Sequence, residues 1–182
     1  MATSTARARD ETDPAVERDG EQRAGHEPAP KPPRSVTLGS VTGYELLRAE
    51  DAAWRASNQM GVANTNLGAQ LGAEQLAARL WRLTPGQAST RHRHARQTEL
   101  YVVLEGTGRI RIDEESLTLS PHSALLVHPR TVRQVFNDTE CDALWLVAGA
   151  PPEPADTLTM SPEQLTDLYP EGPRALPREL GG

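Results

Sequence analysis

The sequence predicts an all-β domain, built as an antiparallel sandwich or barrel, with a disordered tail at its N-terminal end. From Ser35 onward, short apolar runs alternate with turn residues, among them Pro85-Gly86, Pro121 and Pro129. Many short strands at this spacing are typical of antiparallel sandwiches and barrels. The chain has 182 residues, a length that fits one domain with tails better than two domains.

Residues 1–34 are expected to form a disordered tail that ends in a proline-rich linker. They contain five prolines and charges of both signs, and only Met1 and Val16 are large and apolar. Such a segment cannot bury enough apolar surface to offset the entropy lost on ordering. We therefore divide the chain into this tail, extra strands and a connecting segment at 35–76, a core barrel at 77–150 and a C-terminal tail at 151–182.

The strand predictions follow the apolar runs in chain order. One segment is ambiguous, because 73–83 (AEQLAARLWRL) has a helix-favouring composition and carries leucines at helical spacing. We assign its second half to a strand because of the histidine motif that follows it. The ten expected strands are 35–38, 44–47, 77–83, 90–94, 99–104, 109–113, 116–119, 124–128, 132–136 and 143–147.

A short helix is expected near the C-terminus, over about 162–168. Ser161 is a favourable capping residue, Pro162 suits the first helical position, and Gln164 completes a capping box with Ser161. The overall prediction is thus an all-β domain with one short helix after its last strand.

Charge and cysteine content exclude several classes of protein. The formal net charge is -6, so no excess of positive charge is available to neutralise nucleic-acid phosphates. Cys141 is the only cysteine, which precludes an internal disulfide and fits a reducing compartment. No apolar run has the length of a membrane span or the form of a signal peptide. We expect a cytoplasmic protein that binds neither nucleic acid nor membranes.

A candidate metal site is visible at His92, His94 and Glu99. The two histidines are two residues apart, so on a strand both imidazoles point to the same face. Glu99 begins the next apolar run after a short turn, which brings its carboxylate back beside them. Two neutral imidazoles and one carboxylate suit a divalent ion of Fe, Mn, Zn or Ni, with open positions for water or substrate. If Glu99 points inward, Tyr101 shares the interior with it.

An alternative interpretation of the two histidines is an exposed basic turn, because Arg91, Arg93 and Arg96 surround them. The longer pattern favours the metal site. Gly86 precedes the His-x-His pair by five intervening residues, and Gly106 follows the glutamate after six. This spacing resembles the first motif of the cupin superfamily, whose histidines and glutamate are metal ligands.

The second cupin motif is present in a degraded form at 116–137. Pro121, Pro129 and Asn137 fit the family pattern without a gap. His122 stands where the family usually has a glycine, and Arg130 replaces the glycine of a turn. The resemblance covers about 77–147 and implies a double-stranded β-helix, or jelly roll, and a homodimer.

Arg133 occupies the position of the family's third metal-binding histidine. Arginine stays protonated and is not a metal ligand, so its presence leaves two alternatives open. Arg133 orients an anionic substrate beside a metal, or it pairs with Glu99 in an anion pocket without metal. A register shifted by one residue would place Gln134 inside instead, but it would misplace Asn137, so we expect Arg133 to face inward.

Two functional hypotheses follow. In the first, the protein is a metal-dependent enzyme, oxygenase-like or an isomerase, that acts on a small organic anion. Here His92, His94 and Glu99 hold the ion, and Arg133 and Tyr101 are the candidate catalytic residues. In the second, the same pocket binds or senses a small anion without turnover and without metal.

Overall fold

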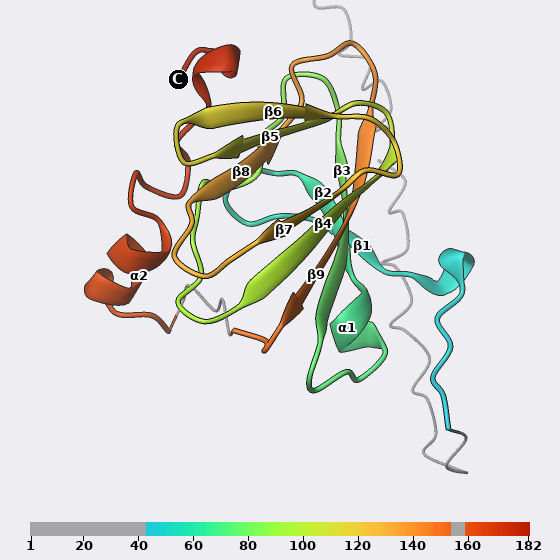
Figure 1. Cartoon of the computed structure of the whole chain (residues 1–182). Helices are drawn as coiled ribbons and strands as arrows, with labels where there is room; N and C mark the ends of the chain where they lie inside the picture. Colours follow the sequence, from blue (N-terminus) through green and yellow to red (C-terminus); the bar gives the residue numbers. More distant parts are fainter. Residues whose placement is uncertain (1–42, 154–158) are drawn as a thin grey trace, which may run out of the picture. The chain divides into compact units, whose positions relative to one another are not determined.

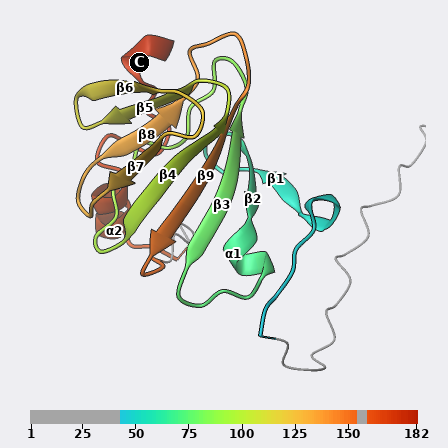
Figure 2. The same cartoon turned by 45° about the vertical axis from the view of Figure 1, so that its right-hand side comes forward.

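Two antiparallel sheets make up the computed structural model, which describes residues 43–153 and 159–182 (Figure 1). The larger sheet has the strand order β1-β2-β3-β9-β4-β7, and the smaller has the order β6-β5-β8. Figure 2 shows β3, β9 and β4 side by side in the larger sheet. The strands are β1 (Trp54–Ala56), β2 (Ala63–Asn66), β3 (Ala77–Leu83), β4 (Thr98–Glu105), β5 (Gly108–Ile112), β6 (Glu115–Leu119), β7 (Ala124–Val127), β8 (Arg133–Phe136) and β9 (Ala143–Ala150).

The core lies between the two sheets and follows from the alternation of side chains along the strands. In β4, Tyr101 and Val103 are buried in this core, whereas Leu100 is 39% exposed on the other face. Ile110 of β5 and Val135 of β8 reach the same core from the smaller sheet. The fold is therefore the expected double-stranded β-helix, closed by apolar side chains that alternate with residues of the outer faces.

Several expected strands differ from the structure. The segment 90–94 is not a strand, because it makes only one antiparallel bridge, between His92 and Arg133. The next amide, that of Arg93, donates instead to the carbonyl of Leu168, so no ladder can continue. The segment 44–47 is not a strand either, and Tyr44 is 71% exposed. The expected strand 35–38 and the expected disordered tail 1–34 lie outside the described residues.

The structure contains two strands that the sequence did not indicate. β1 and β2 carry few apolar residues, yet they extend the larger sheet by pairing with each other and with β3. Asn64 and Thr65 of β2 are 1% and 0% exposed. Polar residues this deeply buried give no apolar pattern, so the sequence carries no local sign of these strands.

The helical elements are short. The second half of the ambiguous segment forms β3, as expected, because pairing with β2 on one side and β9 on the other outweighs its helical propensity. The helix α2 (Pro162–Leu168) has the expected bounds and the expected capping box with Ser161. The remaining helical turns are η1 (Ala49–Asp51), α1 (Leu67–Gln70) and η2 (Arg178–Leu180). None of the helices in the described part of the chain has the length and apolarity needed to cross a membrane.

Two turns of the second motif keep the backbone geometry that glycine usually provides. His122 and Arg130 have φ values of 69° and 71°, in the left-handed region. Side chains with a Cβ are strained there by about 1–2 kcal/mol relative to glycine. The sequence has thus lost the two glycines of the family pattern while the fold still requires left-handed turns.

Replacing His122 by glycine should therefore stabilise the protein. The residue is exposed, so His122→Gly relieves the strained φ without removing a packed side chain, and we expect a gain of about 1 kcal/mol in the free energy of unfolding. Urea unfolding measures this gain. The matched control is His128→Gly, because His128 is also exposed but has no positive φ. The control should lose stability, and a loss in both variants would contradict the strain at His122.

Candidate metal centre

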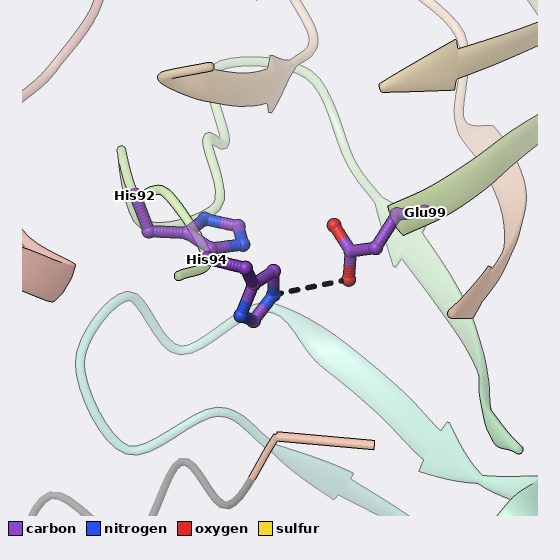
Figure 3. Close-up of side chains that lie close together, drawn as sticks. All are labelled: His92, His94 and Glu99. Carbon is purple, nitrogen blue, oxygen red and sulfur yellow. Dashed lines mark ion pairs between the residues drawn. The ribbon is translucent and has the colours of Figure 1, made fainter. Parts of the chain in front are cut away.

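Three side chains that can bind a metal converge beside the start of β4 (Figure 3). His92 and His94 come from the segment before this strand, and Glu99 is its second residue. One nitrogen of each histidine and one oxygen of Glu99 lie within 4.8 Å of one another. The two imidazole rings stand almost perpendicular, at 85°, with their centroids 5.2 Å apart. The two histidines thus point to the same side, as expected for a strand, although their segment makes only one β-bridge, between His92 and Arg133.

Neighbouring acceptors decide which nitrogen of each imidazole faces this group. His92 Nδ1 lies 2.9 Å from the carbonyl oxygen of Thr90, and His94 Nδ1 lies 3.0 Å from Oε2 of Glu153. Because a carbonyl and a carboxylate only accept hydrogen bonds, each Nδ1 donates its proton. A neutral imidazole whose Nδ1 carries the proton has its lone pair on Nε2, the nitrogen that can then bind a metal.

The carboxylate of Glu99 is divided between two sets of neighbours. Arg133 donates to Oε2 from Nε at 3.1 Å and from Nη2 at 2.7 Å, and the hydroxyl of Tyr101 donates to the same oxygen at 2.6 Å. The other oxygen, Oε1, lies 3.3 Å from Nε2 of His94. Arg133 and Tyr101 therefore occupy one oxygen of Glu99, and the second oxygen faces the histidines.

The electrostatics of the group favour an ionised Glu99. Burial alone would raise the pKa of Glu99, but the neighbouring His94 and the positive charge of Arg133 outweigh it and hold the pKa below its usual range. Burial opposes the charge of Arg133 as well, yet Tyr101 and Glu99 raise its pKa. Burial and the charge of Glu99 raise the pKa of Tyr101 well above its usual value. The Tyr101 hydroxyl thus keeps its proton and donates it.

His92 is neutral at physiological pH. Burial, and then the positive charge of Arg133, lower the pKa of His92 from 6.5 to about 4. The group therefore presents two imidazole nitrogens and one carboxylate oxygen, all acceptors that point toward one another. Such an arrangement is repulsive unless a cation or a proton lies between them, and the donor set suits Fe, Mn, Zn or Ni. The three residues fit a divalent metal ion.

Arg133 and Gln134 are both fully buried, each 0% exposed, but on opposite sides of β8. Arg133 contacts Glu99 inside the barrel, whereas Gln134 donates 2.8 Å hydrogen bonds to the carbonyls of Ser89 and Ala175. The C-terminal segment around Ala175 covers the outer side of this strand. Arg133 thus faces the interior of the barrel, whereas Gln134 faces outward and is buried beneath the C-terminal segment.

A cavity of about 510 Å³ lies beside the three candidate ligands. Its wall includes Glu153, which sequence reasoning missed as the partner of His94. The two residues are 59 positions apart, and nothing near Glu153 in the sequence links it to the histidines. Arg55 and Arg79 line the same cavity from β1 and β3, and no motif pointed to them either.

Comparison with known proteins agrees with this geometry. The family model for the cupin domain matches residues 79–149, a segment that includes β4, β8 and all three candidate ligands. This segment of the chain is a cupin domain. A search of curated proteins gave no significant match to this cupin.

Solved structures share the fold. One from Silicibacter pomeroyi DSS-3, described as a sugar phosphate isomerase of the cupin superfamily, is 25% identical, with a TM-score of 0.53 over 59% of this chain and 76% of its own. A Thermotoga maritima protein described as a predicted oxalate decarboxylase is 17% identical, with a TM-score of 0.52 over 59% of this chain and 99% of its own. A cupin protein from Bacteroides fragilis is 20% identical, with a TM-score of 0.50 over 68% of this chain and 95% of its own.

The lowered pKa of His92 should make the stability of this cupin depend on pH. The unfolded state takes up a proton below pH 6.5, and the folded state does so only near pH 4, so stability is lost as the pH falls between these values. At about pH 5 the expected loss is about 2 kcal/mol. Urea unfolding of metal-free protein at about pH 7 and pH 5 measures it.

The variant His92→Gln should lose about 2 kcal/mol less than the parent over the same pH interval. The matched control is His128→Gln. Because His128 is exposed, this substitution should leave the pH dependence of stability unchanged. Equal losses in the parent and in His92→Gln would contradict the lowered pKa.

Removing Arg133 should destabilise the fold, because Glu99 would stay buried without its cation. For Arg133→Met in metal-free protein we expect a loss of about 3–5 kcal/mol in the free energy of unfolding. The control is Arg130→Met, whose ion pair with Asp167 is exposed and should contribute less than about 1 kcal/mol. A double variant with Glu99→Met should lose less than the sum of the two single variants. Additive losses would show that the two charges are not coupled.

Proposed function

We propose that this cupin is a metal-dependent enzyme that acts on a small organic anion, with a divalent ion held by His92, His94 and Glu99. The observation that carries the proposal is the set of hydrogen bonds that the protein makes to the three side chains. Both Nδ1 atoms and one oxygen of Glu99 are already engaged by the protein, and the remaining atoms converge. This is the pattern expected where neighbours orient metal ligands.

Within this proposal, Arg133 and Tyr101 act on Glu99. The guanidinium of Arg133 donates to Glu99 from Nε and Nη2, and Nη1 donates to the carbonyl of Thr131 at 3.0 Å. The Tyr101 hydroxyl donates to the same carboxylate oxygen. These contacts support a positioning role for both residues, in place of the substrate contact that the sequence suggested for Arg133. They keep Glu99 ionised and hold its free oxygen toward the histidines.

The chemistry of the proposed enzyme depends on what the ion supplies. A bound divalent ion polarises a carbonyl or hydroxyl oxygen of the substrate as a Lewis acid. Such polarisation serves an isomerase, and the 25% identical structure described as a sugar phosphate isomerase supports this alternative over an oxygenase. Glu153 would keep His94 in the tautomer that binds the ion, because it accepts the Nδ1 proton.

A second candidate function is a binding or sensing cupin without metal. The ion pair between Arg133 and Glu99 favours it, because a buried guanidinium already balances the carboxylate. That pair nevertheless uses only Oε2, and Oε1 remains directed at His94 Nε2. The enzyme is therefore the better supported of the two functions. A homodimer and a cytoplasmic location remain expectations from the resemblance and the sequence.

Metal content separates the two candidate functions. Protein purified without an affinity tag should contain close to one divalent ion per chain by elemental analysis, and His94→Ala should lose it. Glu153→Gln should weaken metal affinity by about 10–100-fold, because the variant orients His94 less firmly. The control is Glu105→Gln, whose side chain is 62% exposed and pairs with Arg82, away from the histidines. A parent protein that cannot be loaded with Fe, Mn, Zn or Ni would support the binding module.

Turnover tests the enzyme itself. The parent loaded with each of the four metals is incubated with small sugar phosphates, while NMR follows the substrate and an electrode follows oxygen. Conversion without oxygen uptake is the outcome expected of an isomerase, whereas oxygen uptake coupled to product would support the oxygenase. Metal-loaded protein that binds these anions but converts none of them would overturn the enzymatic proposal.

A further inference from the structure

Two arginines line the cavity beside the candidate metal centre without a carboxylate partner. Arg55 comes from β1 and Arg79 from β3, and both are part of the cavity wall. Within residues 43–153 and 159–182, neither makes an ion pair; Arg55 donates to Ala56 and Asn58, and Arg79 donates to Asn64. Arg82, on the opposite face of β3, instead lies 3.5 Å from Glu105. Within the described residues, the positive charges of the two cavity arginines are thus not paired with a carboxylate.

Arg79 is held in place by a buried amide. Its Nη1 donates to Oδ1 of Asn64 at 3.1 Å, and Asn64 is only 1% exposed. The Nδ2 of Asn64 donates in turn to the carbonyls of Arg55 and Val62, at 3.2 Å and 3.3 Å. Because both sides of this amide are engaged, its orientation is fixed, and so is the guanidinium that it contacts. Among the described residues, the other N–H groups of Arg79 have no acceptor and can donate to a ligand.

The charges and hydrogen-bond donors of this wall suit an anionic ligand. Burial, and then the charge of Arg55, lower the pKa of Arg79, whereas the charge of Glu99 raises it, so the two arginine cations disfavour each other. Gln97, 3% exposed, lines the same cavity, and its amide nitrogen has no hydrogen-bond partner in the described part of the chain. An oxyanion between the arginines would relieve the repulsion and supply acceptors to this wall.

The strand register sets the distance between the arginines and the candidate metal centre. Arg79 of β3 is opposite Val147 of β9, and Val147 is opposite Tyr101 of β4. Arg79 therefore lies two strands away from the residue that holds Glu99, or about 10 Å between backbones. A small molecule with an anionic group at one end can span this interval with its reacting carbon near the histidines.

We propose that Arg55 and Arg79 form the subsite for the phosphate group of a small phosphate monoester. This inference rests on the proposed function, because it names the substrate class of the same cavity. Two unpaired guanidinium groups match the double charge of a phosphate monoester, whereas a single carboxylate would neutralise only one of them. Arg133 is less suited to this purpose, since each of its three nitrogens already donates to Glu99, Tyr101 or Thr131.

The test uses full-length protein freed of metal by a chelator, so that no ion can bind the probe. Calorimetry measures the binding of inorganic phosphate at about pH 8, where phosphate is mainly a dianion. The parent should bind it, and Arg79→Gln and Arg55→Gln should each weaken binding by about tenfold or more. Arg82→Gln is the matched control, on the same strand but the opposite face, and should bind as the parent does. Arg55 is exposed, so its variant should fold even if the Arg79 variant does not.

Two further arms separate the possible failures. Acetate should bind the parent at least about tenfold more weakly than phosphate, and equal binding would overturn the phosphate assignment. His94→Ala should lose metal but keep its affinity for phosphate, which distinguishes failure of the metal proposal from failure of this one. No phosphate binding by the metal-free parent, or unchanged binding in Arg55→Gln, would overturn the subsite.

Discussion

The buried carboxylate of Glu99 is the constraint on which the rest of this site depends. A carboxylate that is 8% exposed costs free energy unless each oxygen has a partner. Arg133 and Tyr101 satisfy one oxygen from β8 and β4, so the two sheets are joined by a charged pair as well as by apolar packing. The other oxygen is directed at His94. The position of the ionised Glu99 carboxylate is therefore fixed by the partners that its burial requires.

Arg133 explains how a cupin can keep its first motif while its second motif is degraded. An arginine in place of a neutral ligand would repel a divalent ion if its charge were free. Here the guanidinium is paired with Glu99 and fully buried, so the charge near the histidines is offset. The second motif thus supplies a partner for Glu99. The cavity arginines that no described carboxylate pairs with, Arg55 and Arg79, lie on β1 and β3 of the larger sheet.

The two walls of the cavity differ in how their polar groups are used. On the side of β4 and β8, donors and acceptors are matched except for the converging lone pairs of the candidate ligands. On the side of β1 to β3, the donors of Arg79 outnumber their acceptors in the described chain. A wall rich in acceptors suits a cation, and a wall rich in donors suits an anion. This division supports a substrate bound by its two ends.

The sequence by itself determined the strands with strong apolar alternation, the capped helix and the three candidate ligands. Their signals are local, since the period of two, the capping box and the spacing from Gly86 to Gly106 each lie within a short stretch of chain. Only the tertiary structure decided that β1 and β2 join the sheet, because these polar strands form by pairing with β3. Only it brought Glu153 to His94 and, within the described residues, left Arg55 and Arg79 without a carboxylate partner, because such contacts join residues far apart in sequence and depend on which strands become neighbours.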